Sequence, residues 1–405
     1  MRRISIGNVV IENTQFDKLN VLTDDDDKVI FLPLLWTIHL ANTGSVYRWH
    51  KRGSFTSTGS IFQTRKPSFV EKVFEMRSVA ENTIDNYIGH LFQFIKYINT
   101  LNKTAGTPSV HHTELINSRF INHYLNSILP EKLRSVASLN AHQAAISAYF
   151  SFLYEIEIKD LIPSTIYRKT HQLIAEMDCR AKKVNYVSRA ERSALFRACN
   201  SERDRLIIRM GFEVGLRAGE NKGLMLNDSK AKGSKQMGLL RLFDELDIHP
   251  EKQSFEYVLI GKYTKGGKTR NIYFDRTLLV AMKHYYDNER LVVVQRSGCT
   301  SNTFFVRNDN AGAGLPIRSW QASILFSKLR NKHSQMNSML CYHDLRHTFA
   351  TELYHSELLD PEGQETRSES AALIVVAERL GHKNPSTSVR YIRLRHQMLI
   401  IEDAI

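Results

Sequence analysis

Residues 342–351 have the sequence Tyr-His-Asp-Leu-Arg-His-Thr-Phe-Ala-Thr; a Leu-Gly-His tripeptide ends at His382, and Tyr391 follows nine positions later. If residues 342–351 are helical, His343 and Arg346 share a face, because side chains three positions apart are neighbours on a helix. Arginine offers a fork of donors that can hold two oxygens of one phosphate, and histidine can hold or pass a proton near neutral pH. Two imidazoles, a guanidinium and a phenol together suit the attack of a tyrosine on a phosphodiester.

The length and charge of the chain narrow the class of partner. With 405 residues the chain is too long for one compact core, so two or three domains are expected. Lys and Arg number 55 against 42 Asp and Glu, a formal net charge of +13. An excess of this size favours a polyanionic partner, because each phosphate that a cation neutralises releases counterions. A basic protein that is merely soluble would have the same composition.

The cysteines and the N-terminus favour the cytoplasm. The four cysteines lie far apart with no Cys-x-x-Cys pair, which argues against a disulfide framework and against a structural zinc site. The basic N-terminus continues into acidic and polar residues, so no signal peptide is expected. The most apolar early run, 29–40, is too short to cross a bilayer. We therefore expect a cytoplasmic protein with no membrane partner.

Residues 1–69 differ from the rest of the chain. The apolar runs 9–11 and 29–32 predict short strands, and glycines among serines and threonines predict turns. The segment 47–52 mixes cations with aromatic residues, which suits contact with a DNA backbone but is equally typical of a solvated hairpin. We expect a β-rich N-terminal segment whose role the sequence does not indicate.

Residues 70–166 are predicted to form a small helical bundle. Apolar residues recur at intervals of three and four over 84–98, which indicates a helix with one buried face. A second helix is expected over 113–128, ended by Pro130, and a third over 138–154.

A basic linker is expected over 167–186, and its Lys182 and Lys183 are candidate DNA contacts. The final domain, 187–405, begins with the sequence of a capping box at Ser188, whose glutamate partner comes three residues later. This domain is expected to be mostly helical with one β-hairpin.

The hairpin is predicted from strands over 257–260 and 270–274. Between and beside them, four cations lie around two glycines: Lys262, Lys265, Lys268 and Arg270. A tight turn that projects cations can meet phosphate oxygens in a groove of DNA. From these residues alone a solvated hairpin tip explains the pattern equally well.

Taken singly, the other candidate residues have ordinary explanations. Arg217 and Glu220 are close enough for the carboxylate to orient the guanidinium, but such a pair is usually a surface salt bridge. A lone histidine is more often a buried residue bonded to backbone than a catalytic one. Tyr391 is one of 16 tyrosines, most of which must be packing residues.

A metal site is the alternative for the helix over 342–351. His343 and His347 have the i, i+4 spacing of zinc-binding helices, but Asp344 stands where those helices carry glutamate, and no third ligand lies at a fixed spacing. We therefore expect no metal and no other cofactor.

In their order along the chain, these motifs resemble those of the tyrosine site-specific recombinases, the phage integrase family. The matching residues are Arg217 and Glu220 in Gly-Leu-Arg-x-x-Glu, the hairpin lysine Lys265, His343 and Arg346 in His-x-Leu-Arg-His-Thr, His382 and Tyr391. The resemblance covers roughly residues 70–400, and the bundle is similar to the family's core-DNA-binding domain. It implies a mainly α fold with a small β-sheet, in which that bundle and a mixed α/β catalytic domain form a C-shaped DNA clamp. Residues 228–253 and 356–370 are expected to be insertions.

The resemblance also implies a mechanism. Tyr391 would attack the scissile phosphorus and form a 3′-phosphotyrosyl intermediate, while Arg217 and Arg346 hold the non-bridging oxygens. Lys265 would protonate the 5′-oxygen leaving group, although Lys262 and Lys268 flank it. His343 would assist proton transfer at the tyrosine, His382 would donate a hydrogen bond to the phosphate, and Glu220 would orient the arginines.

The implied function is that of a recombinase or integrase that moves a bacterial or phage-derived mobile element, in association with the nucleoid. Its partners would be double-stranded DNA, three further copies in a tetramer on two synapsed duplexes, and accessory DNA-bending or directionality proteins. The apolar tail 392–405 would dock on a neighbouring copy, or else pack on its own domain. The alternatives are a type IB topoisomerase, a telomere-resolving enzyme and a catalytically silent DNA-binding regulator.

Overall fold

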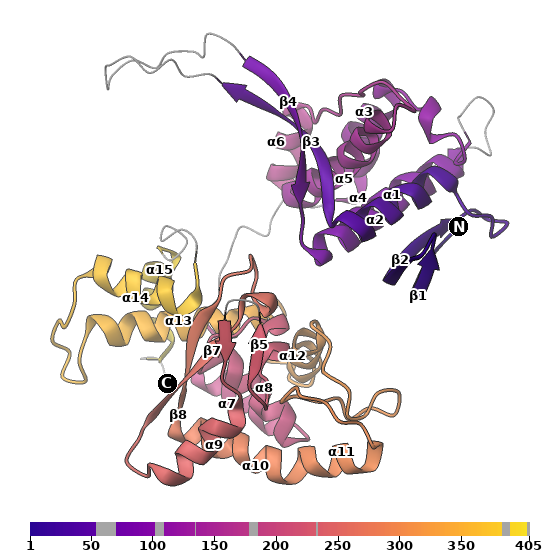
Figure 1. Cartoon of the computed structure of the whole chain (residues 1–405). Helices are drawn as coiled ribbons and strands as arrows, with labels where there is room; N and C mark the ends of the chain where they lie inside the picture. Colours follow the sequence, from indigo (N-terminus) through magenta and orange to yellow (C-terminus); the bar gives the residue numbers. More distant parts are fainter. Residues whose placement is uncertain are drawn as a thin grey trace. The chain divides into compact units, whose positions relative to one another are not determined.

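The computed structural model describes residues 1–53, 70–101, 109–133, 135–177, 185–231, 234–382 and 389–402. The chain divides into two compact units, Met1–Ala181 and Lys182–Ile405, each with its own hydrophobic core (Figure 1). As predicted, the fold is mainly helical, and the strands described pair into small two-stranded antiparallel sheets.

The first unit combines two hairpins with a helical bundle. The hairpins are β1 (Arg2–Ile11) with β2 (Thr14–Thr23), and β3 (Ser45–Gly53) with β4 (Val70–Ser78). The helices are α1 (Phe31–Thr43), α2 (Glu81–Leu101), the 3₁₀ turn η1 (Thr113–Leu115), α3 (Ser118–His123), the π-turn η2 (Tyr124–Ile128), α4 (Leu129–Lys132), α5 (Val136–Glu155) and α6 (Arg168–Met177). One core joins Trp36 of α1 to Leu91 of α2 and Tyr149 of α5, so the N-terminal residues belong to the bundle.

The predicted strand over 29–32 is wrong, because α1 begins at Phe31. Leu32, Trp36 and Leu40 recur every four residues and are all buried, which is the spacing of one helical face. Arg48 of β3 donates a hydrogen bond to the Tyr87 hydroxyl. The side chains of 49–52, where DNA contact was considered, lie outside the described residues.

Two further expectations for this unit need correction. The helix predicted over 113–128 is interrupted: α3 begins after Asn117, whose side chain caps it, and Pro130 lies in the first turn of α4, where the missing N–H costs nothing. Part of the predicted linker 167–186 is the helix α6, whose Ile174 is buried in the bundle core.

The second unit is a helical domain with one longer hairpin. Its helices are α7 (Arg189–Ala198), α8 (Glu202–Phe212), α9 (Leu239–Ile248), α10 (Arg276–Tyr285), α11 (Leu291–Ser297), α12 (Gln321–Asn331), α13 (Tyr342–Leu358), α14 (Glu369–Leu380) and α15 (Arg390–Glu402). Shorter turns are η3 (Ala218–Gly223), η4 (Gly261–Tyr263) and η5 (Tyr286–Arg290). The strands are β5 (Ser229–Ala231) with β6 (Ser234–Gln236), and β7 (Ser254–Leu259) with β8 (Arg270–Asp275), which is the predicted hairpin.

Capping and close packing fix the elements that carry the candidate residues. The predicted capping box at Ser188 is present, with both reciprocal hydrogen bonds to Glu191. Gly215 ends the turn after α8 at φ +71°, and a Cβ there would lie 2.5 Å from the ring of Phe349 on α13. Only glycine therefore lets this turn approach α13 so closely. In the segment 228–253, α9 buries Phe243 in the main core, so this part is integral to the domain.

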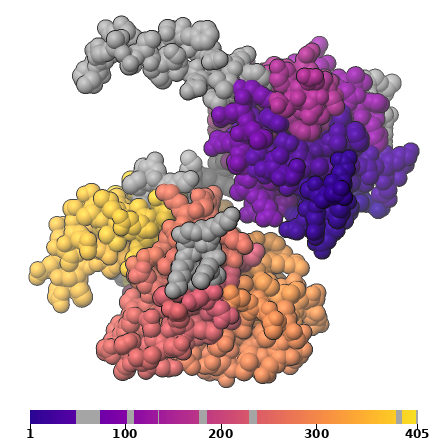
Figure 2. Space-filling model, viewed as in Figure 1, coloured from indigo at the N-terminus to yellow at the C-terminus, as the bar shows by residue number. Residues whose placement is uncertain are grey.

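The C-terminal helices pack on their own domain. Leu394 and Met398 of α15 are buried in a cluster with Tyr354 of α13 and Val376 of α14. In Figure 2 the yellow C-terminal helices adjoin the salmon surface of the same unit. Leu394 and Met398 therefore bury their apolar area in cis, and docking of the tail on a neighbouring copy stays a prediction. Within the described part of the chain, no helix is both long and apolar enough to cross a membrane.

Candidate active site

Three arginines converge on one buried carboxylate, that of Glu220 in η3. Arg217 donates from Nη1 to Oε1 at 2.7 Å, and Arg270 binds both oxygens at 2.9 and 2.7 Å. Nη1 of Arg346 lies 3.7 Å from Oε2. Burial of Glu220, which is 2% exposed, would by itself raise its pKa. The hydrogen bonds from Arg270 and the charges of all three arginines outweigh burial and hold the pKa at about 2.

Arg346 is fixed by the backbone of two other elements. Its guanidinium donates to the carbonyl of Gly215 and, at 2.6 Å, to the carbonyl of Leu380 at the end of α14. The residue is 1% exposed, and burial together with the charge of Arg217 lowers its pKa to about 9, so it stays cationic at neutral pH. The side chain of Arg217 is 24% exposed. The pair therefore presents one buried and one accessible guanidinium beside Glu220.

Arg270 does not face DNA as predicted. It is buried, and its two terminal nitrogens are turned to Glu220. The reason is the period of two in β8, where Arg270, Ile272 and Phe274 are buried while Asn271 and Asp275 are exposed. The alternation is visible in the sequence, so the inward direction of Arg270 could have been predicted from Ile272 and Phe274.

Two histidines, His347 and His382, flank the ring of Tyr391, and a third, His343, contacts His347. Nδ1 of His347 lies 3.3 Å from the Tyr391 hydroxyl, and the His343 ring contacts His347 edge to face at 4.5 Å between centroids. The His382 ring is nearly parallel to that of Tyr391, at 6.3 Å and 11°. These residues come from α13, from the first turn of α15 and from the position after Gly381, whose left-handed φ of +64° ends α14. Tyr391 is 1% exposed.

The electrostatics keep all three imidazoles neutral at pH 7. Desolvation and the charges of Arg346 and Arg217 lower the pKa of His343 and of His382 to about 4. Of the three histidines, His343 is the one that is exposed at the surface. Deeper burial lowers the pKa of His347 to about 2. Burial raises the pKa of the Tyr391 phenol, and the nearby arginine charges oppose that rise only in part.

A comparison with protein families decides the class of this site. The model described as "Phage integrase family" matches residues 185–398, more than half of the chain. The chain belongs to the phage integrase family. It is a tyrosine recombinase, an enzyme of DNA recombination, as the order of its motifs predicted.

Solved structures of site-specific recombinases and integrases are similar to this chain at low identity. The XerH recombinase in a post-cleavage complex with difH DNA has 18% identity and a TM-score of 0.49, over 79% of this chain and 80% of that one. The Tn1549 transposon integrase with circular-intermediate DNA has 16% identity and a TM-score of 0.45, over 77% and 90%. A lambda integrase dimer bound to a COC′ core site has 13% identity and a TM-score of 0.42, over 78% of this chain and 72% of that one. The comparison with curated proteins gave no match.

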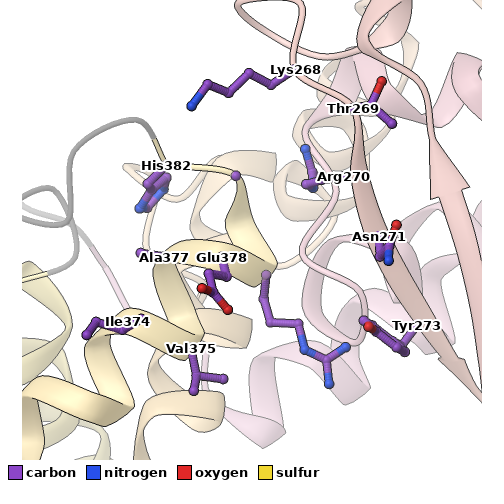
Figure 3. A pocket seen from close by; sticks show the side chains of 12 residues that line it. Lys268, Thr269, Arg270, Asn271, Tyr273, Ile374, Val375, Ala377, Glu378 and His382 are labelled. Atoms are coloured by element: carbon purple, nitrogen blue, oxygen red, sulfur yellow. The ribbon is translucent and has the colours of Figure 1, made fainter. Parts of the chain in front are cut away.

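The hairpin lysines of this integrase-family domain are exposed, and they differ in what they face. Lys268 lines a cavity of about 650 Å³ together with Arg270 and His382. In Figure 3 its side chain extends over the mouth of this cavity, on the side where His382 lies. Lys265, the predicted general acid, is not among the lining residues, and Lys262 lines a different cavity.

The structure brings together most of the predicted site residues of this family member and adds one. Arg217, Glu220 and Arg346 form one cluster, and His343, His382 and Tyr391 form a second beside it. Lys182 and Lys183 lie outside the described residues. The addition is His347, which the sequence analysis weighed as a metal ligand and placed in the His-x-Leu-Arg-His-Thr motif without a role of its own. Among the described residues, no group of three or more His, Cys, Asp or Glu could hold a metal ion.

Proposed function

We propose that this chain is a site-specific recombinase that integrates or excises a mobile element, with Tyr391 as its nucleophile. The observation that carries the proposal is the convergence of Arg217, Arg346, His343 and His382 around one buried phenol. In the proposed reaction the Tyr391 oxygen bonds to the scissile phosphorus, the bond to the 5′-oxygen breaks, and a 3′-phosphotyrosyl enzyme results. A 5′-hydroxyl from another strand then reverses the step and exchanges the strands.

The arginines supply the charge that the transition state needs. Attack on a phosphodiester concentrates negative charge on the non-bridging oxygens, and fixed donors aimed at those oxygens lower the barrier. Arg217 is accessible to a phosphate, while Arg346 is held by two backbone carbonyls and cannot swing away. Glu220 keeps both guanidinium groups in place. Loss of one such donor typically costs ~10²–10³ in rate.

The leaving 5′-oxygen needs a proton, and a hairpin lysine is the proposed donor. The resemblance assigns this role to Lys265, whereas Lys268 is the lysine that lines the cavity with His382. Both sit on the turn between β7 and β8, so DNA that enters the site would meet both. Proton donation by a positioned acid is worth roughly 10²–10⁴ in rate.

Access to Tyr391 requires a change on DNA binding. The residue is 1% exposed, so a phosphorus atom cannot reach its oxygen unless neighbouring groups move. We propose that DNA opens this arrangement and that the first unit contributes the core-binding half of a clamp around the duplex. The net charge of +13 fits such a partner. A tetramer on two synapsed duplexes and accessory DNA-bending proteins complete the proposal.

The test is the formation of a covalent adduct on a nicked duplex that carries the direct repeats flanking the gene. The wild type should form an adduct that protease digestion removes, and Tyr391→Phe should form none. Tyr354→Phe is the matched control, because Tyr354 is also a buried tyrosine of this unit and its hydroxyl has no hydrogen-bond partner among the residues that the structure describes. Adduct formation by Tyr391→Phe would refute the assignment of the nucleophile. Specific binding without any adduct would favour a silent regulator, and relaxation of supercoiled DNA without a site would favour a topoisomerase.

A further inference from the structure

We propose that His347 is a catalytic residue, which accepts the proton of Tyr391 at its Nδ1 when the phenol attacks. The inference rests on the proposed function, in which Tyr391 is the nucleophile. It moves the base from His343, where the family resemblance placed it, to the second histidine of the same helix.

The geometry favours His347. Its Nδ1 is 3.3 Å from the Tyr391 hydroxyl, and it is the hydrogen-bond partner of that hydroxyl among the described residues. Catalytic hydrogen bonds are often this long before substrate binds and tighten in the complex. His347 is 6% exposed, so water does not compete readily for Nδ1. The His343 ring contacts the His347 ring edge to face, and His343 is exposed to solvent.

The direction of the hydrogen bond follows from the protonation states. Burial first, then the neighbouring His343 ring and the charge of Arg390, keep the His347 imidazole neutral, and burial keeps the Tyr391 phenol protonated. A neutral imidazole carries one proton, so Nδ1 can accept only in the tautomer that holds the proton on Nε2. The phenol then donates to Nδ1, and its oxygen keeps a lone pair for attack.

A bound phosphate would make His347 a stronger base. The charges that depress its basicity are those of Arg346 on α13 and Arg390 on α15; the other ionisable groups that face it, His343 on α13 and His382 after α14, are neutral at pH 7. The negative charge of a phosphodiester among these groups cancels part of their field, which favours the imidazolium form. The base is therefore weak while the site is empty and becomes effective when the substrate arrives.

The Tyr391 oxygen forms its bond to phosphorus, its proton moves to Nδ1 of His347, and the bond from phosphorus to the 5′-oxygen breaks as a hairpin lysine protonates that oxygen. In rejoining, an incoming 5′-hydroxyl attacks phosphorus and gives its proton to the neutral hairpin lysine, the bond from phosphorus to the Tyr391 oxygen breaks, and the imidazolium returns its proton to that oxygen.

The experiment compares three substitutions of His347 in the full chain, on the nicked duplex described above. His347→Asn places an amide near the position of Nδ1, whereas His347→Gln places it near Nε2. We expect His347→Ala and His347→Gln to cleave ~10²-fold or more slowly than the wild type, and His347→Asn to recover about tenfold of that loss. His355→Ala, on the same helix but away from Tyr391, is the matched control and should cleave like the wild type.

The pH dependence separates a proton acceptor from a packing residue. In His347→Ala, hydroxide must replace the missing acceptor, so the cleavage rate should rise about tenfold per pH unit across the neutral range, while the wild-type rate stays flat. DNA affinity should not change. The proposal is wrong if His347→Ala cleaves within threefold of the wild type, or if Asn and Gln variants are equally slow. If wild-type protein forms no adduct that depends on Tyr391, the proposed function fails instead.

Discussion

Neutralising Glu220 should destabilise the second unit by about 3–5 kcal/mol, because the change leaves a cluster of buried guanidinium groups without a counter-charge. Glu220 is 2% exposed, binds Arg270 through both oxygens and also holds Arg217, with Arg346 at 3.7 Å. The pKa of Glu220 supports a similar figure. A carboxyl whose pKa falls from 4.5 to about 2 on folding contributes about 3 kcal/mol at neutral pH.

The pH window follows from the direction of the shift. A carboxyl with a depressed folded-state pKa stabilises the fold fully above its unfolded value of 4.5, and that contribution is lost as the pH falls toward 2. The wild type should lose about 3 kcal/mol of stability over this window through Glu220 alone, and Glu220→Gln should lack that part of the acid dependence.

Calorimetry of the full chain at pH 7 and at pH 3 measures both effects. Glu220→Gln should lower the transition of the second unit by about 6–20 °C at pH 7 and leave that of the first unit unchanged. Glu362→Gln is the control, since Glu362 is exposed in the same unit and should change stability by less than about 0.5 kcal/mol. A loss below about 1 kcal/mol for Glu220→Gln, or an unchanged acid dependence, would show that the arginine cluster does not need this carboxylate.

Three further outcomes are expected. Arg346→Lys should reduce cleavage by ~10²–10³, measured as adduct formation, because an ammonium lacks the planar guanidinium that spans the carbonyls of Gly215 and Leu380 and still has N–H groups left for a phosphate oxygen; retention of the full rate would exclude the clamp. A duplex in which sulfur replaces the 5′-bridging oxygen has a leaving group that needs no proton, so it should restore cleavage to a variant that lacks the general acid. Rescue of Lys268→Ala but not of Lys265→Ala would identify Lys268 as the acid. Rescue of neither variant would exclude both lysines from that role. Leu394→Ala should destabilise the second unit by about 2–5 kcal/mol in dilute protein, as for a buried core leucine. Unchanged stability together with a loss of synapsis would instead show that Leu394 docks on a neighbouring copy.

Local sequence rules predicted much of what surrounds the site. The capping box at Ser188 and the hairpin of β7 and β8 depend on residues a few positions apart, and the structure has both. The same holds for the buried face of α2. The strand expected over 29–32 failed because a short apolar run does not distinguish a strand from the first turn of a helix.

The sequence by itself determined which residue types occur and in which order, and this was sufficient to indicate the family and most of the candidate site. The tertiary structure alone decided which of them meet. Arg270 turns to Glu220 across 50 positions, and His347 reaches Tyr391 across 44. Neither contact follows from local spacing, because each depends on how β8 and α15 pack against η3 and α13. The tail, likewise, lies on its own domain because α13 and α14 offer Leu394 and Met398 an apolar surface that no pattern within residues 392–405 reveals.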